Sequence, residues 1–555
     1  DPREPCLGTR VLARLLPYHV GLGKCSIARK RRSEPAPGAN LGRCSPVAVM
    51  VPWAERCRCA SSVEAGAVDE EERMESITTG VPGLDQVLHG GLKPRALHVV
   101  GGLPGTGKTT LAQQIGYHHA KEGGRVLYLA ALSETAERLV GHASEFTFFD
   151  PGMVAQRIYY ISVYPKLEEG GLPAVLDEVR MLSLEHKATL VCLDGVATLK
   201  AAAPSPLEFR RFVFDLNTQV RSLGATTLVL GPWMEREAFE PESAVADGIL
   251  TLSLESGGGR PQRFLEVLKL RGVEYLTGRH SLTITREGMA VYPRLEAVVR
   301  ASGLPEPPSK WSRVGTGSPG LDKMLHGGLP SGSVTLVVGP PGAGKTTLGL
   351  GFVAEGGRRG EAGVYLGFDD APSRLIARAD AMGLGLGKMV ADSVVRAHWL
   401  PAVELIPDQV AWKLLDMVDE HSARRVVIDG IDLLMAALAS QGRSQSFLTA
   451  LARGLRGRNA TAILTYELPR MVDAASDVPL EPARAGLDNI VVLQHAELRS
   501  ELHRLVSILK VRDSDFDTSI REFTISRGGL QVSDTHGGAE AVLTGIGRRR
   551  GRRAQ

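Results

Sequence analysis

The chain has little of what marks several large classes of protein. Aromatic residues make up only 5% of its 555 residues, and no run of eighteen apolar residues occurs. A membrane-spanning helix needs about 20 predominantly apolar residues, so none is expected. A stacking surface for single-stranded nucleic acid needs aromatic side chains among basic ones, and no stretch combines them. The formal net charge is only +3, too small to argue for nucleic acid by itself. We expect a soluble, cytoplasmic protein.

Cysteine is also scarce over most of the chain. Five of the 6 cysteines lie within the first 59 residues, and the last, Cys192, lies in an apolar stretch. A zinc site would need paired C-x₂₋₄-C spacings, and only the tight Cys57-x-Cys59 pair approaches one. We expect neither a zinc site nor a disulfide framework. Cys192 is expected to be a buried core thiol.

The two ends of the chain differ from its middle. Residues 1–73 are rich in Arg and Pro, show no sustained hydrophobic period and do not begin with Met. We expect a disordered extension there, with the working protein starting near Met74. Residues 536–555 end in GRRRGRRAQ, which predicts a basic disordered tail. Such a tail could also contact nucleic acid, anionic lipid or an acidic partner.

Between these ends one sequence unit occurs twice. TGVPGLDQVLHGGL at Thr79–Leu92 returns as TGSPGLDKMLHGGL at Thr316–Leu329, 237 residues later. Repeats of this kind indicate duplicated structural units. We predict a first repeat at 74–298 and a second repeat at 311–535. The Pro-rich segment 299–310 between them is predicted to be an extended linker.

Each repeat contains a G-x-x-x-x-G-K-T motif between an apolar, strand-like run and a helix-like pattern. Its glycines let backbone N–H groups turn towards phosphates, and the following helix adds its positive N-terminal end. Lys108 and Lys345 are predicted to reach the β- and γ-phosphates, and the Thr109 and Thr346 hydroxyls to coordinate Mg²⁺. The predicted nucleotide-binding residues are Gly102, Gly105, Thr106, Gly107, Lys108, Thr109 and Thr110, and then Gly339, Gly342, Ala343, Gly344, Lys345, Thr346 and Thr347.

Strand-like and helix-like stretches alternate through both repeats. This alternation predicts α/β domains, each a mostly parallel sheet flanked by helices. The stretch TLVCLD ends at Asp194, and its counterpart RRVVID ends at Asp429. A carboxylate at the end of a buried parallel strand lies beside the P-loop and can hold the hydration shell of Mg²⁺. Either Asp could instead cap a helix, but we favour the Mg²⁺ role because each follows a P-loop.

Taken together, these motifs resemble the KaiC family of RecA-type ATPases. The resemblance rests on the TG…GLD…GGL opening, the P-loop, the acidic residues after the next strand and the strand-end Asp, all of them repeated. It covers the chain from Met74 to about Asp534, and the GLD–GGL opening is particular to KaiC-like and RadA-like proteins. The resemblance implies two tandem RecA-like P-loop domains that bind ATP and Mg²⁺. It also implies a ring of subunits, usually a hexamer.

The resemblance further implies two adjacent glutamates after the second core strand, where a carboxylate takes the proton of the nucleophile. Here the first repeat has Ser133 and Glu134, and the second has Asp369 and Asp370. A serine hydroxyl is a poor base, and Glu134 points away from its neighbour's position in an extended chain. Asp369 keeps the charge but is one methylene shorter. These acids could also be solvated residues at a helix start. We predict that both repeats bind ATP and that the second is the better hydrolase.

A Lys-x-Arg pair lies near the end of each repeat, Lys269 with Arg271 and Lys510 with Arg512. Residues two apart in a strand share a face, so each pair is predicted to point one way. From the residues alone, the simplest interpretation of these pairs is the polar face of an edge strand. The resemblance implies that this strand contacts the nucleotide bound to the neighbouring subunit, so that its cations reach the γ-phosphate there. An arginine finger of this kind raises the rate of phosphoryl transfer about 10³–10⁵-fold.

Three functions are compatible with these motifs. The leading one is an ATP-hydrolysing assembly switch with protein partners that the sequence does not identify. A RadA- or RecA-like DNA-dependent ATPase is an alternative, and so is a scaffold that binds ATP and hydrolyses little. The clock member of the family phosphorylates its own Ser and Thr just before a strand that here begins at Asp488. Arg484 and Ala485 occupy those places, and the nearest upstream hydroxyl is Ser476, so that autokinase chemistry is not expected.

Overall fold

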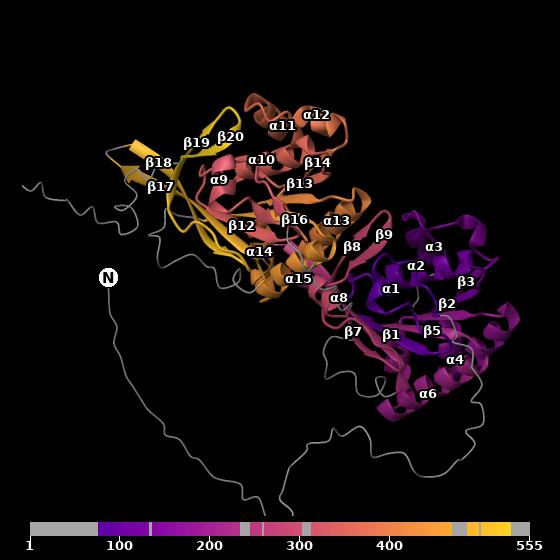
Figure 1. Cartoon of the computed structure of the whole chain (residues 1–555). Helices are drawn as coiled ribbons and strands as arrows, with labels where there is room; N and C mark the ends of the chain where they lie inside the picture. The colour runs from indigo at the N-terminus through magenta and orange to yellow at the C-terminus, as the bar shows by residue number, and fades with distance from the viewer. Residues whose placement is uncertain are drawn as a thin grey trace, which may run out of the picture. The chain divides into compact units, whose positions relative to one another are not determined.

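Figure 1 shows the protein as a computed structural model, and its described residues are 76–131, 136–232, 245–257, 260–301, 312–468, 486–498 and 501–533. The predicted N-terminal extension, most of the linker and the basic tail lie outside these residues. Among the helices of the described residues, none is both long and apolar enough to cross a membrane.

The first repeat is built on one sheet, which has nine strands in its described part, in the order β3-β2-β4-β5-β1-β6-β7-β8-β9. The six strands from β3 to β6 pair in parallel, and β7, β8 and β9 continue the sheet in antiparallel pairs. The strands are β1 (Leu97–Gly102), β2 (Val126–Ala130), β3 (Ile158–Ser162), β4 (Leu190–Asp194), β5 (Thr226–Gly231), β6 (Gly248–Gly257), β7 (Arg260–Leu270), β8 (Arg279–Thr285) and β9 (Gly288–Tyr292).

The second repeat has a sheet of the same design, in the order β14-β13-β15-β16-β12-β17-β18-β19-β20. Its strands are β12 (Val334–Gly339), β13 (Gly363–Gly367), β14 (Val395–Trp399), β15 (Arg425–Asp429), β16 (Thr461–Glu467), β17 (Asn489–Leu498), β18 (Glu501–Val511), β19 (Arg521–Ser526) and β20 (Gly529–Val532). A short antiparallel pair, β10 (Arg313–Val314) with β11 (Leu329–Pro330), precedes β12.

Helices cover both faces of each sheet, as Figure 1 shows. In the first repeat these are α1 (Leu84–Val87), α2 (Lys108–Lys121), α3 (Ala136–Ser144), the 3₁₀ turn η1 (Pro151–Met153), α4 (Tyr164–His186), α5 (Val196–Ala202) and α6 (Pro206–Ser222). Helix α8 (Leu295–Ala301) follows β9. The second repeat has α9 (Pro319–Met324), α10 (Lys345–Arg358), α11 (Pro372–Ala381), α12 (Leu386–Ala391), α13 (Pro407–Glu420), α14 (Ile431–Ala439) and α15 (Ser444–Gly457).

The central strands are mostly apolar because each buries both faces. In β12, Leu336 and Val338 pack with α13, α14 and α15, whereas Val337 packs on the opposite face with α10. Successive side chains of a strand point to opposite faces, so a strand covered on both sides favours apolar residues on both faces. This packing confirms the predicted α/β class with mostly parallel sheets. Cys192 in β4 is fully buried, as expected, and burial raises the pKa of its thiol.

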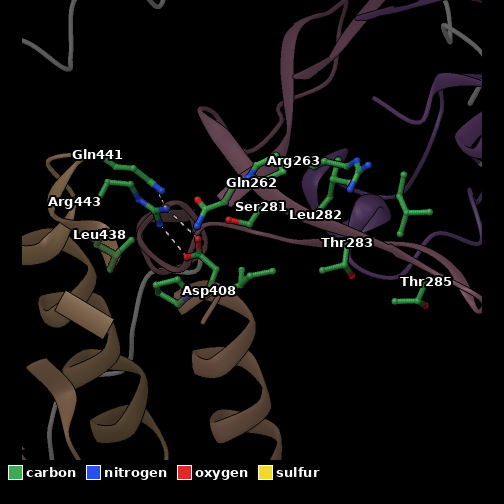
Figure 2. A pocket seen from close by; sticks show the side chains of 14 residues that line it. Gln262, Arg263, Ser281, Leu282, Thr283, Thr285, Asp408, Leu438, Gln441 and Arg443 are labelled. Atoms are coloured by element: carbon green, nitrogen blue, oxygen red, sulfur yellow. Dashed lines mark hydrogen bonds and ion pairs between the residues drawn. The ribbon is translucent and has the colours of Figure 1, made fainter. Parts of the chain in front are cut away.

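A buried ion-pair cluster ties α8 to the second repeat. Glu296 of α8 accepts hydrogen bonds from Arg443, which lies in the turn between α14 and α15. The same guanidinium donates two bonds of 2.9 Å to Asp408 of α13, and Asp408 has no exposed surface. Figure 2 shows Arg443 beside Asp408 and Gln441, which are among the residues that line a pocket.

Candidate nucleotide sites

The second P-loop connects the central strand β12 to helix α10. Gly344 caps α10 with a φ of 103°, a left-handed conformation that favours glycine. A Cβ on Gly339 would lie 2.5 Å from the backbone oxygen of Leu493, so this position has no room for a side chain. The loop therefore turns tightly enough for its N–H groups to face a phosphate at the N-terminus of α10.

Lys345, the first residue of α10, is held over the loop by three acceptors. Its Nζ donates to the carbonyl oxygens of Gly339 at 2.8 Å and Pro340 at 3.0 Å. The third acceptor is Oε2 of Glu467, at 3.2 Å. The Lys345 side chain is only 9% exposed, so little water screens the attraction between its ammonium group and the Glu467 carboxylate.

Asp429, at the end of β15, is fixed by three hydroxyl donors. Thr346 donates to its Oδ2 at 2.8 Å, Tyr365 to the same oxygen at 2.6 Å, and Thr465 to Oδ1 at 2.6 Å. A hydroxyl and a carboxylate side by side suit Mg²⁺, which keeps several waters and takes its other ligands from phosphates. Among the described residues, no cluster of three or more His, Cys, Asp or Glu side chains could hold a metal by itself.

The two acidic residues after β13 face different partners. Asp369 lines the cavity beside the P-loop, and its pKa is raised by burial and then by the charges of Asp429 and Glu467. Asp370 instead accepts a hydrogen bond of 2.6 Å from Arg378 of α11. Asp369 is therefore placed to act on a nucleotide in the cavity, and Asp370 is placed to hold Arg378.

The cavity of the second site has a volume of about 400 Å³ and collects residues from six segments of the repeat. Of the predicted residues, it contains Gly342, Gly344, Lys345, Thr346, Thr347, Asp369 and Asp429. The sequence motifs did not identify four further polar residues that line the cavity, Arg378, Asp432, Thr465 and Glu467. The end of β16, TYE, offered a signal, because the carboxyl ends of parallel strands meet at one edge of the sheet.

The first site repeats the core of this geometry. Lys108 donates to the carbonyl oxygens of Gly102 at 2.7 Å and Leu103 at 2.9 Å. Thr109 and Tyr128 each donate to Oδ2 of Asp194 at 2.9 Å. Burial lowers the pKa of Lys108, and the charge of Asp194 partly offsets this effect. The predicted pair Ser133 and Glu134 lies outside the described residues, so the structure does not place it.

The Lys-x-Arg pairs lie at the ends of β7 and β18. Lys510 donates to the backbone oxygen of Leu487 at 2.7 Å, and Arg512 lies 3.5 Å from Oδ1 of Asp488. A bulge near the end of β18 shifts the register, with Lys510 opposite Ile490, and Arg512 follows the last residue of the strand.

The first repeat shows the same arrangement at its own strand end. There, Arg271 lies 3.8 Å from Asp247 and follows the last residue of β7. Among the described residues that line the second cavity, neither Lys510 nor Arg512 occurs.

The segment that would carry phosphoacceptors is only partly described. Ser476, Arg484 and Ala485 lie outside the described residues. Asp488, which follows them, has a structural role: its carboxylate accepts hydrogen bonds of 2.9 Å from the backbone N–H of Val334 and from Nε of Arg456.

Comparison with known proteins agrees with this geometry. A family model described as "ATPase: KaiC" matches residues 77–296 and 314–537, which together are more than half of the chain. The circadian clock oscillator protein KaiC of Picosynechococcus sp. is 26% identical over 486 residues, 85% of this chain and 92% of that protein. The protein of the same name from Synechococcus elongatus is 25% identical over 494 residues, 86% of this chain and 92% of that protein. The chain belongs to the KaiC family of ATPases, with the ATPase domain in two tandem RecA-like copies.

Proposed function

We propose that this ATPase is an ATP-dependent assembly switch in which the second repeat hydrolyses ATP and the first holds it. The observation that carries the proposal is the second cavity, which brings together Lys345, Thr346, Asp369 and Asp429. These side chains supply a cation for the phosphates, an oxygen pair for Mg²⁺ and a carboxylate for the nucleophile. Phosphoryl transfer needs little more than such positioning and charge stabilisation.

Each side chain of the second site has a distinct task in this proposal. Lys345 neutralises charge on the β- and γ-phosphates, and Thr346 with Asp429 would hold Mg²⁺, which would neutralise further negative charge on the phosphates. Asp369 accepts the proton of the attacking water. The raised pKa of Asp369 suits this task, because a base works best when its pKa lies closer to the working pH.

The first site is proposed to bind ATP for stability and assembly. It has the P-loop lysine and the Thr109–Asp194 pair, but Ser133 occupies the place of the first acid. A ligand that binds only the folded state stabilises it by about 2.7 kcal/mol at a hundredfold excess over its dissociation constant. Slow hydrolysis would keep this stabilisation in place.

We further propose that the subunits form a homohexameric ring. Lys510 and Arg512 support this, because they lie at the end of β18 and outside the lining that the structure describes for the second cavity. Lys269, Arg271, Lys510 and Arg512 would then serve the nucleotide of a neighbouring subunit. The assembled state would recruit protein partners, and the switch would consist of ATP-dependent assembly.

The test combines sizing with turnover. We expect a ring-sized particle with ATP and Mg²⁺, a smaller particle without nucleotide, and turnover that single-stranded DNA leaves unchanged. Turnover that rises several-fold with DNA would favour a RadA- or RecA-like motor instead. Assembly with negligible turnover would favour a scaffold, and phosphate transferred from labelled ATP into the chain would reveal a serine/threonine autokinase of the family type.

A further inference from the structure

Glu467 is the last residue of β16 and lies beside the P-loop. In the parallel register of β12 and β16, Glu467 pairs with Gly339, the first glycine of the P-loop. Its carboxylate lies 3.2 Å from Nζ of Lys345, although 122 residues separate the two in the chain. The Glu467 side chain is 50% exposed, so it can leave this pair without unpacking the core.

The first repeat has no carboxylate at the equivalent place. Asp194 pairs with Leu230 in the first sheet, and Asp429 pairs with Thr465 in the second. Two residues further along, Pro232 corresponds to Glu467, and proline carries no charge. The P-loop lysine of the first repeat, Lys108, donates to backbone carbonyl oxygens. Among the described residues, the two sites therefore differ in what holds the lysine that the γ-phosphate needs.

Glu467 also belongs to a crowded set of carboxylates. Its backbone N–H donates to Oδ1 of Asp432 at 3.1 Å, and the charge of Glu467 contributes to the raised pKa of Asp369. Asp369, Asp432 and Glu467 line the same cavity as Asp429, and Lys345 and Arg378 are the cations of that lining. A γ-phosphate entering this cavity brings further negative charge and competes with Glu467 for Lys345.

We propose that Glu467 is a positioning residue that holds Lys345 whenever the γ-phosphate is absent, so that the second site favours ADP relative to ATP more than the first site does. With ADP bound, Lys345 contacts the β-phosphate and keeps Glu467. With ATP bound, the γ-phosphate displaces the carboxylate of Glu467 from Lys345. The negative charges of Glu467 and the γ-phosphate then lie close together. After hydrolysis Glu467 regains Lys345, which speeds the departure of inorganic phosphate. This inference rests on the proposed function of the second site.

The experiment measures two affinities at one site. In full-length protein carrying Lys108→Ala, which silences the first P-loop, calorimetry gives the Kd for ADP and for the non-hydrolysable analogue AMP-PNP, both with Mg²⁺. Glu467→Gln is expected to strengthen the binding of AMP-PNP relative to ADP, so that the ratio of the two Kd values changes about tenfold, equivalent to about 1.4 kcal/mol. Glu467→Asp keeps the charge and should keep most of the original preference. Asp419→Asn is the matched control, because it neutralises a carboxylate of similar exposure that pairs with Arg458 instead.

The outcomes separate this inference from the proposed function. A ratio in Glu467→Gln within twofold of the parent would overturn the role of Glu467, while leaving the second site as an ATP site. A parent Lys108→Ala protein that binds neither nucleotide would overturn the proposed function itself, and this inference with it. General destabilisation would weaken both ligands together and leave their ratio unchanged. The converse variant, Pro232→Glu in a Lys345→Ala background, should shift the first site towards ADP, and an unchanged ratio there would count against the mechanism.

Discussion

The guanidinium of Arg443 lies 2.7 Å from the carboxylate of Glu296 and 2.9 Å from that of Asp408, so one cation joins helix α8 to the body of the second repeat. Asp408 is completely buried, and the Arg443 side chain is 9% exposed. Burial raises the pKa of Asp408, and the hydrogen bonds and charge of Arg443 act in the opposite direction. Asp408 is thus a buried carboxylate whose negative charge is balanced by the guanidinium of Arg443.

Removing that partner should destabilise the protein strongly. We expect Arg443→Met to cost about 3–5 kcal/mol, because it leaves Asp408 buried and without its cation. Thermal or urea unfolding of the full chain measures the loss. Arg458→Met is the control: Arg458 pairs with Asp419 at the surface, where an ion pair contributes about 0–1 kcal/mol. Equal losses in the two variants would contradict a special role for the buried cluster.

Turnover should fall at acid pH because the carboxylate of Asp369 becomes protonated. A base must be ionised, so the rate declines as the pH drops through the pKa of Asp369, which burial and then the carboxylates of Asp429 and Glu467 raise. Glu467→Gln removes one of these charges and should move the acid limb of the kcat profile to lower pH. Asp416→Asn, at another carboxyl with a raised pKa, should leave the limb in place. A limb that does not move in Glu467→Gln would argue against Asp369 as the base.

The two P-loop lysines should have different roles. We expect Lys345→Ala to reduce turnover by at least tenfold, because it removes the cation that neutralises the phosphates at the hydrolysing site. Lys108→Ala should reduce assembly and thermal stability more than turnover, since bound ATP stabilises by mass action. Size-exclusion chromatography, thermal unfolding with ATP and a phosphate-release assay measure the three effects. A Lys108→Ala protein that forms intact rings and has lost turnover would reverse the proposed division of labour.

Mixing two inactive variants tests the proposed role of the cations at the end of β18. Arg512→Ala and Lys345→Ala should each be nearly inactive alone if Arg512 serves the neighbour's site. After subunit exchange with ATP, some interfaces join an intact P-loop to an intact Arg512, and turnover should return. Energy transfer between labelled subunits confirms the exchange.

Two other results are distinguishable in the same experiment. If exchange occurs and activity stays absent, the cations act within their own chain. If Arg512→Ala alone keeps nearly full turnover, Arg512 serves the strand end, where it lies 3.5 Å from Asp488.

Local sequence patterns were enough to predict the parts of the sites whose geometry depends on neighbouring residues. The P-loop spacing placed Lys345 and Thr346 at the start of a helix, because a cradle of backbone N–H groups needs only a few consecutive residues. The apolar runs ending in Asp194 and Asp429 placed these carboxylates at strand ends. The repeated GLD–GGL opening set the number of domains, since a duplicated sequence folds into a duplicated unit.

The residues that join the sites from distant parts of the chain could be identified only from the folded structure. Strand β12 lies between β16 and β17, so residues more than a hundred positions later flank the P-loop, and this order brings Glu467 to Lys345. The pairing of β15 with β16 brings Thr465 to Asp429. In the same way, Arg443 meets Glu296 only because α8 packs on α15. Motif spacing encodes short-range backbone geometry, whereas these contacts depend on strand order and on packing across the sheet, which no local pattern specifies.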